Sequence, residues 1–143
     1  MLLPSSRFYA VHYQTHPPLV WGVVLRPMTA PEFTEACELL LAEARRHGGC
    51  LYWLLDGRAD ANARPPDLYH WLVEEFLPRA RRALTQVPYL AFLAHAGAWD
   101  DVQARRFAPA EPVLARANWF TAEAEARAWL DAHRPAPAGP AAT

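Results

Sequence analysis

Two side chains have the types and placement that acid–base chemistry requires. Asp56 directly follows the apolar run 50–55, and His95 directly follows the apolar run 88–94. If both runs are neighbouring strands, the carboxylate and the imidazole meet at one edge of the sheet, where the acid can orient the base. No Ser or Cys is placed beside them as a nucleophile. We favour the simpler interpretation that Asp56 caps the following loop and His95 is a surface turn residue, so the sequence predicts no catalytic residue and no enzyme.

The remaining reactive groups also have structural interpretations. Cys37 falls on the apolar stripe of an expected helix and Cys50 opens an expected strand, and free Cys is commonly a small core residue. No pair of cysteines flanks any histidine as in a zinc site. All fourteen basic residues are Arg, so a Schiff-base or phosphate-binding Lys is excluded, and no glycine-rich nucleotide motif occurs. The sequence predicts no metal and no cofactor.

Length, composition and charge exclude several classes of protein. The 143 residues suffice for one domain with one core, and 52% of them are apolar. A net charge of −1 gives no electrostatic reason to expect nucleic acid as a partner. No apolar run approaches the roughly 20 residues of a membrane span, and the first residues are too short in their apolar part for a secretory signal. We expect a cytoplasmic domain over residues 1–134 and a disordered, Pro- and Ala-rich tail over residues 135–143.

The clearest structural signal is the run from Cys50 to Asp56–Gly57. It is apolar without alternation and has a helical pattern on each side, which is typical of a strand buried in an α/β sheet. The capping box Thr29–Glu32 opens the best-defined helix. In the next helix, Pro78 predicts a kink or a restart at Leu77. Expected strands cover residues 7–13, 19–25, 50–55, 88–94 and 112–119, and expected helices begin near residues 29, 65, 99 and 121.

This order predicts one α/β domain with a mixed five-stranded sheet, an N-terminal hairpin followed by parallel strands, and about four helices. In the last helix, Thr121 is expected to be the N-cap, and Ala124, Ala128 and Trp129 are expected to be buried. The first strand, at the expected edge of the sheet, is apolar or aromatic on both faces. Such an edge needs a cover, so we expect a homodimer with aromatic residues at the contact.

The layout resembles the SpoIIAA-like, or STAS-like, group of small bacterial domains. The motifs that carry the resemblance are Trp21-Gly22, Thr29-Ala-Pro-Glu-Phe33, Leu54-Leu55-Asp56, Trp71-Leu-Val-Glu-Glu-Phe-Leu-Pro78, and Trp119-Phe120 before Glu125-Ala-Arg-Ala-Trp-Leu130. The resemblance implies a regulatory or protein-interaction module. Anti-sigma-factor antagonists of the group carry a phosphorylatable Ser directly after the Asp, whereas this chain has Gly57 there. We therefore expect no phospho-switch at that position.

Two surfaces follow as candidates for binding. The contact edge for an unknown protein partner comprises Asp56, Gly57, Arg58, Asp60, His95 and Trp99, because the carboxyl ends of strands are where α/β sheets place contacts. The group is also similar to lipid-binding CRAL-TRIO domains, which implies an alternative, an apolar small molecule held near Trp21, Trp71 and Phe76.

Overall fold

The computed structural model describes residues 7–59, 70–94 and 115–135, which contain one five-stranded mixed sheet. The strands lie in the order β1-β2-β3-β4-β5, with β1 antiparallel to β2 and all later neighbours parallel. The expected hairpin and parallel strands are therefore confirmed, as is the position of the first strand at the edge. The bounds are Tyr9–Gln14 (β1), Leu19–Val24 (β2), Tyr52–Asp56 (β3), Tyr89–Leu93 (β4) and Arg116–Phe120 (β5).

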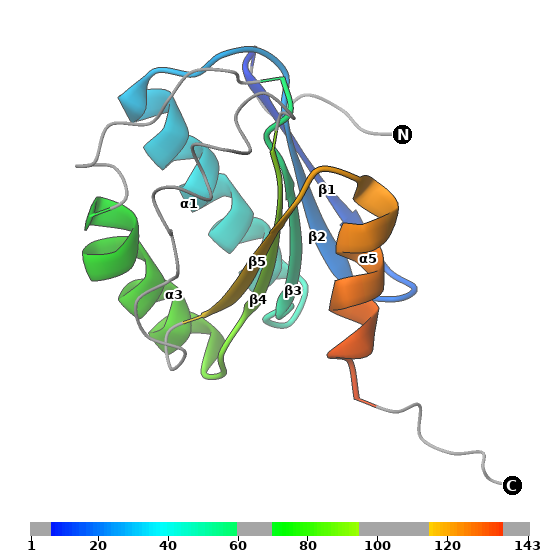
Figure 1. The fold of residues 1–143 in the computed structure, drawn as a ribbon. Coiled ribbons are helices and arrows are strands. Elements are labelled where there is room, and N and C mark those ends of the chain that lie inside the picture. The colour runs from blue at the N-terminus through cyan, green and yellow to red at the C-terminus, as the bar shows by residue number, and fades with distance from the viewer. Residues whose placement is uncertain (1–6, 60–69, 95–114, 136–143) are drawn as a thin grey trace, which may run out of the picture.

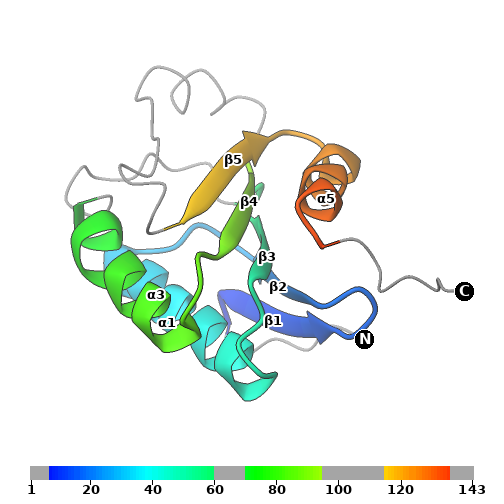
Figure 2. The same ribbon diagram turned by 90° about the horizontal axis from the view of Figure 1, so that it is seen from below.

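The described elements form three layers. Helices α1 (Ala30–Arg46) and α3 (Leu77–Leu84) lie on one face of the sheet, and α5 (Glu123–Ala132) lies alone on the other (Figures 1 and 2). The described residues thus hold three α-helices rather than about four. The expected helix near residues 99–107 falls outside them, as do residues 136–143 of the expected disordered tail.

Helix α1 begins as its sequence predicts. The hydroxyl of Thr29 accepts a hydrogen bond from the amide of Glu32 at 3.3 Å, and the Glu32 carboxylate accepts one from the amide of Thr29 at 2.9 Å. These bonds satisfy amides that the first turn leaves unpaired. At the other end Gly48 has a φ of +80°, a conformation that costs glycine little. One face is buried, through Ala36, Cys37, Leu40, Leu41 and Ala44.

The second helix is irregular just before Pro78, where a kink or a restart was expected, but it does not restart there. Residues Leu72–Phe76 form a π-helical turn (η1), and α3 begins at Leu77 with Pro78 in its first turn. The amide of Leu77 donates to the carbonyl of Leu72, so the helix continues through the π-helical turn into α3, and the widened turn accommodates a proline that has no amide to donate. Phe76, Leu77 and Ala80 face the core and are at most 2% exposed.

Glycine is required in β2 by close packing. A Cβ added to Gly22 would overlap the hydroxyl of Tyr9 and lie 2.8 Å from Cδ2 of Leu40. Tyr9 is 3% exposed, so its ring crosses the sheet surface in the space that Gly22 leaves open beneath α1. The absent side chain in β2 thereby allows an aromatic ring of the edge strand to join the core.

The last helix differs from our expectation in its N-cap and in the side that faces the sheet. The N-cap of α5 is Ala122, with no side-chain hydrogen bond, and not Thr121. Ala126 and Leu130 are the buried positions, whereas Ala124 and Ala128 are exposed and Trp129 is half-buried. Alternate positions of this helix are alanine, so alanine spacing does not indicate which side faces the sheet. The bulk of Leu130 decides it, because Leu130 packs with Leu19 and Leu54.

Candidate functional site

Asp56 is the one buried charged residue among the described residues, with 9% exposure at the carboxyl end of β3. Both of its carboxylate oxygens are held by Arg58. The guanidinium donates to Oδ1 at 3.0 Å and to Oδ2 at 2.7 Å, and the amide of Arg58 donates to Oδ1 at 3.1 Å. This pairing raises the pKa of the Arg58 guanidinium above its ordinary value. Asp56 thus caps the following loop, as the simpler interpretation of this residue expects.

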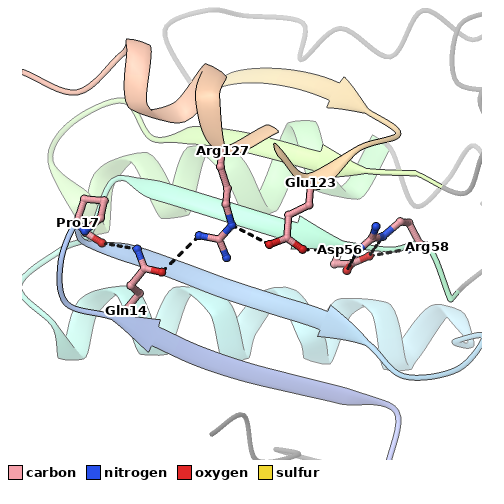
Figure 3. A network of polar contacts seen from close by, with 6 residues as sticks. All are labelled: Gln14, Pro17, Asp56, Arg58, Glu123 and Arg127. Carbon is pink, nitrogen blue, oxygen red and sulfur yellow. Dashed lines mark hydrogen bonds and ion pairs between the residues drawn. The ribbon is translucent and has the colours of Figure 1, made fainter. Parts of the chain in front are cut away.

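The Asp56–Arg58 pair is one end of a chain of polar contacts, drawn in Figure 3. Arg58 Nη2 lies 3.6 Å from Glu123 Oε1 in the first turn of α5, and Glu123 Oε2 accepts from Arg127 Nε at 2.8 Å. Arg127 Nη1 then donates to Gln14 Oε1 at 3.3 Å. Gln14 in turn donates to the carbonyl of Pro17 at 3.0 Å. The chain of contacts ties α5 to β3 at one end and to the β1–β2 hairpin at the other.

Trp21 lies beneath this chain on the same face of the sheet. The Arg127 guanidinium carbon is 5.2 Å from the centre of its ring, a cation–π geometry, and His12 meets it edge-on at 6.2 Å. The indole Nε1 is buried and has no hydrogen-bond partner among the residues that the structure describes. Trp21 is half-buried beside Leu19, Leu54 and Leu130, so it acts as a packing residue under Arg127.

The first three residues of the predicted contact edge lie together in the structure. Asp56, Gly57 and Arg58 are consecutive at the end of β3, and the Gly57 amide donates to the carbonyl of Leu93 at 2.9 Å, which fixes the loop start against β4. Arg58 remains exposed, with 42% of its side chain accessible. Asp60, His95 and Trp99 lie outside the described residues, so the interpretation of His95 as a surface turn residue stays a prediction.

The three residues predicted to line an apolar ligand site do not share one surface. Trp21 faces α5, whereas Trp71 and Phe76 belong to the cluster beneath α1 and α3, on the opposite face of the sheet. Phe76 is 2% exposed and has Trp71 stacked at 5.5 Å and Trp53 edge-on at 6.5 Å. The space around Phe76 is therefore filled by side chains.

The described residues contain neither a metal-binding cluster nor a membrane-spanning helix. His12 and His16 stand four residues apart, but they lie in a strand and its turn rather than on one helical face. In the part of the chain that the structure describes, no three His, Cys, Asp or Glu side chains are grouped to hold a metal ion. Within the same part, no helix has the length and apolar character to cross a membrane.

Sequence reasoning missed three members of the polar chain, namely Gln14, Glu123 and Arg127. Glu123 and Arg127 are four residues apart in α5, which is a readable signal for an ion pair within one helix. Gln14 had no local signal, because its partner Arg127 is 113 residues away.

Comparison with known proteins gives no match, since no family model, no curated protein and no solved structure is significantly similar to the chain. The STAS-like resemblance therefore rests on the sequence motifs alone.

Proposed function

We propose that this chain is a non-enzymatic protein-interaction module, resembling STAS-like domains, whose contact surface is the carboxyl edge of the sheet around Arg58. The observation that carries the proposal is that the Arg58 guanidinium binds both carboxylate oxygens of Asp56. The carboxylate is therefore already paired rather than free to orient an imidazole base.

The same pairing supports a role in binding. Arg58 is held by Asp56 and, more distantly, by Glu123, so its side chain is ordered while 42% of it stays accessible. An arginine that is already oriented loses little conformational freedom when a partner binds, and arginine is enriched among the residues that dominate interface energies. Both anchors lie on regular elements, β3 and α5, which keep the guanidinium in place.

The test is quantitative affinity capture from a native lysate with the immobilised full chain. We compare wild type with Arg58→Ala and with the control Arg116→Ala. Arg116 is also exposed, but it begins β5 and so lies at the opposite end of the parallel strands. We expect a specific protein to be retained by wild type and by Arg116→Ala, and to be reduced by more than about tenfold with Arg58→Ala.

Two outcomes contradict the proposal. Equal capture by Arg58→Ala and wild type, with both variants folded by circular dichroism, places the contact surface elsewhere. A clear catalytic turnover by the purified chain, with no protein specifically retained, overturns the non-enzymatic assignment.

A further inference from the structure

Helices α1 and α3 lie side by side on one face of the sheet and run in the same direction (Figure 2). Helix α1 leads into β3 and the α3 helix leads into β4, and these two strands are parallel. Both helices therefore end at the amino edge of the sheet, where the parallel strands begin. A Cβ added to Gly49 would lie 3.9 Å from Cδ2 of Leu84, so the two C-terminal ends are close together. Side chains at these ends belong to one surface.

One ion pair bridges the seam between the two helices. Arg79 of α3 donates to Oε1 of Glu38 in α1 at 2.7 Å. The hydrogen bond lowers the pKa of the Glu38 carboxyl and raises the pKa of the Arg79 guanidinium. At this level of the seam, a carboxylate on one helix is thus matched by a guanidinium on the other.

Nearer the C-terminal ends, the seam has arginine on both helices. Arg45 follows Glu38 by seven residues, which places it about two turns farther on the same side of α1. Arg82 follows Arg79 by three residues, which places it about one turn farther on a similar side of α3. Both arginines are exposed, and within the described parts of the chain neither side chain has a hydrogen bond, an ion pair or a ring contact. This part of the seam therefore has two cations and no carboxylate that pairs with them.

The acids of α1 nearest to Arg45 do not neutralise it. The carboxylate of Glu43 is already held by Arg46 Nη2 at 2.5 Å and by His47 Nε2 at 2.9 Å. Glu35 stands ten residues before Arg45, about 15 Å along the helix, which exceeds the screening length of about 8 Å at physiological salt. The positive charge of Arg45 is therefore left uncompensated at this end of the helix.

The helix dipole accounts for only part of this arrangement. A cation near a helix C-terminus is favoured by the dipole, which explains one arginine on each helix. The dipole does not require Arg45 and Arg82 to share a seam, because any exposed side of the last turns would serve. On neighbouring helices the two like charges repel each other, and an anion between them would relieve this repulsion.

We propose that Arg45 and Arg82 form a docking site for a short acidic segment of a protein partner. An Asp or Glu carboxylate of that segment pairs with the two guanidinium groups and supplies the anion that this part of the seam lacks. Arginine suits the role because its planar guanidinium binds a carboxylate through two parallel hydrogen bonds. The site lies at the opposite end of the parallel strands from Arg58, so it is a second surface and does not depend on the first.

The surrounding charges limit the partner to a short segment. Farther from the amino edge, the same layer of helices exposes Glu35, Glu74 and Glu75. These carboxylates repel a longer polyanion, such as nucleic acid or an anionic membrane surface, that extends across both helices. A segment with a few acidic residues reaches the two arginines without meeting these glutamates.

Titration of the full chain with a synthetic peptide of consecutive glutamates, followed by NMR at low salt, tests the proposal. We expect saturable shifts that cluster in the C-terminal turns of α1 and α3 and that become smaller as salt is added. The double variant Arg45→Gln, Arg82→Gln should raise the dissociation constant about tenfold, because it removes both exposed charge pairs. Arg116→Gln is the matched control, since Arg116 is also exposed but begins β5, and it should bind the peptide as wild type does.

The outcomes that overturn the proposal are distinct. Absence of saturable binding by wild type, or shifts that cluster elsewhere, removes the docking site without the use of any variant. Equal binding by wild type and the double variant also overturns it, and a lower thermal stability of that variant would then mean that the two arginines serve the helix ends alone. Tighter binding of a single-stranded DNA of equal charge overturns the assignment of the partner as an acidic protein segment. A glutamine peptide of equal length should not bind.

Discussion

The two faces of the sheet are held by different kinds of interaction. Beneath α1 and α3 lies a large cluster of buried apolar side chains that includes Trp53, Phe76 and Leu77. Beneath α5 the cluster is smaller, with six buried residues, and arginine contacts surround it. Salt screens exposed charge pairs and weakens them, whereas it does not weaken hydrophobic burial. One face should therefore determine global stability, and the other should respond to solution conditions.

Truncation of one large side chain on each face should give the largest change in stability and so tests this comparison most directly. Phe76→Ala should lower the free energy of unfolding by about 3–5 kcal/mol, because it opens a cavity between Trp53 and Trp71. Leu130→Ala should cost less, near the lower end of about 2–5 kcal/mol, because α5 covers the smaller cluster. Urea unfolding of both variants measures the difference. A larger loss for Leu130→Ala would reverse the assignment of the two faces.

Removal of one arginine tests the polar contacts of the α5 face. Arg127→Ala removes the bond to Glu123, the bond to Gln14 and the cation–π contact with Trp21. We expect a loss of about 1 kcal/mol at low salt that becomes smaller as salt is added, because 30% of this side chain is exposed. Amide hydrogen exchange should speed up mainly in α5. Arg116→Ala is the control, and an effect of Arg127→Ala that does not change with salt would mean that packing, not charge, dominates.

Acid titration gives the smallest effect and concerns the cap of α1. The Arg26 guanidinium, which bonds the Glu32 carboxylate, and the backbone of Thr29 lower the pKa of Glu32 from 4.5 to about 2. A lowered pKa in the folded state means that Glu32 contributes stability above pH 4.5, and this contribution is lost as the pH falls toward 2. Glu32→Gln keeps the hydrogen-bonding geometry of the cap without the charge. Its unfolding midpoint should therefore fall less than that of wild type between these pH values. Parallel curves for the two proteins would contradict the assignment.

The difference between the faces also explains which features could be predicted from the sequence. The α1 face depends on local signals. The Thr29–Glu32 box and the apolar stripe of α1 were confirmed, and Pro78 marked the place where the second helix becomes irregular. The contacts of the α5 face join distant parts of the chain, such as Gln14 with Arg127 and Arg134 with the carbonyl of Pro18. The spacing of apolar residues along the sequence does not predict contacts between distant residues. The alternating alanines of α5 also gave no indication of which side of this helix faces the sheet. Of the predicted contact edge, Asp56 and its following loop were identified because a strand that ends in Asp-Gly is a local signal.

The packing of Tyr9 against Gly22 has a consequence for how this sequence can change over time. The tyrosine ring fills the volume that the glycine leaves, so a larger residue at position 22 is tolerated only if position 9 becomes smaller. Either substitution alone should be lost by selection, while the pair can be exchanged together. In homologous chains, positions 9 and 22 are therefore expected to vary jointly, with the sum of their side-chain volumes nearly constant. An alignment in which a large residue at position 22 accompanies an aromatic residue at position 9 would show that the hairpin packs differently there.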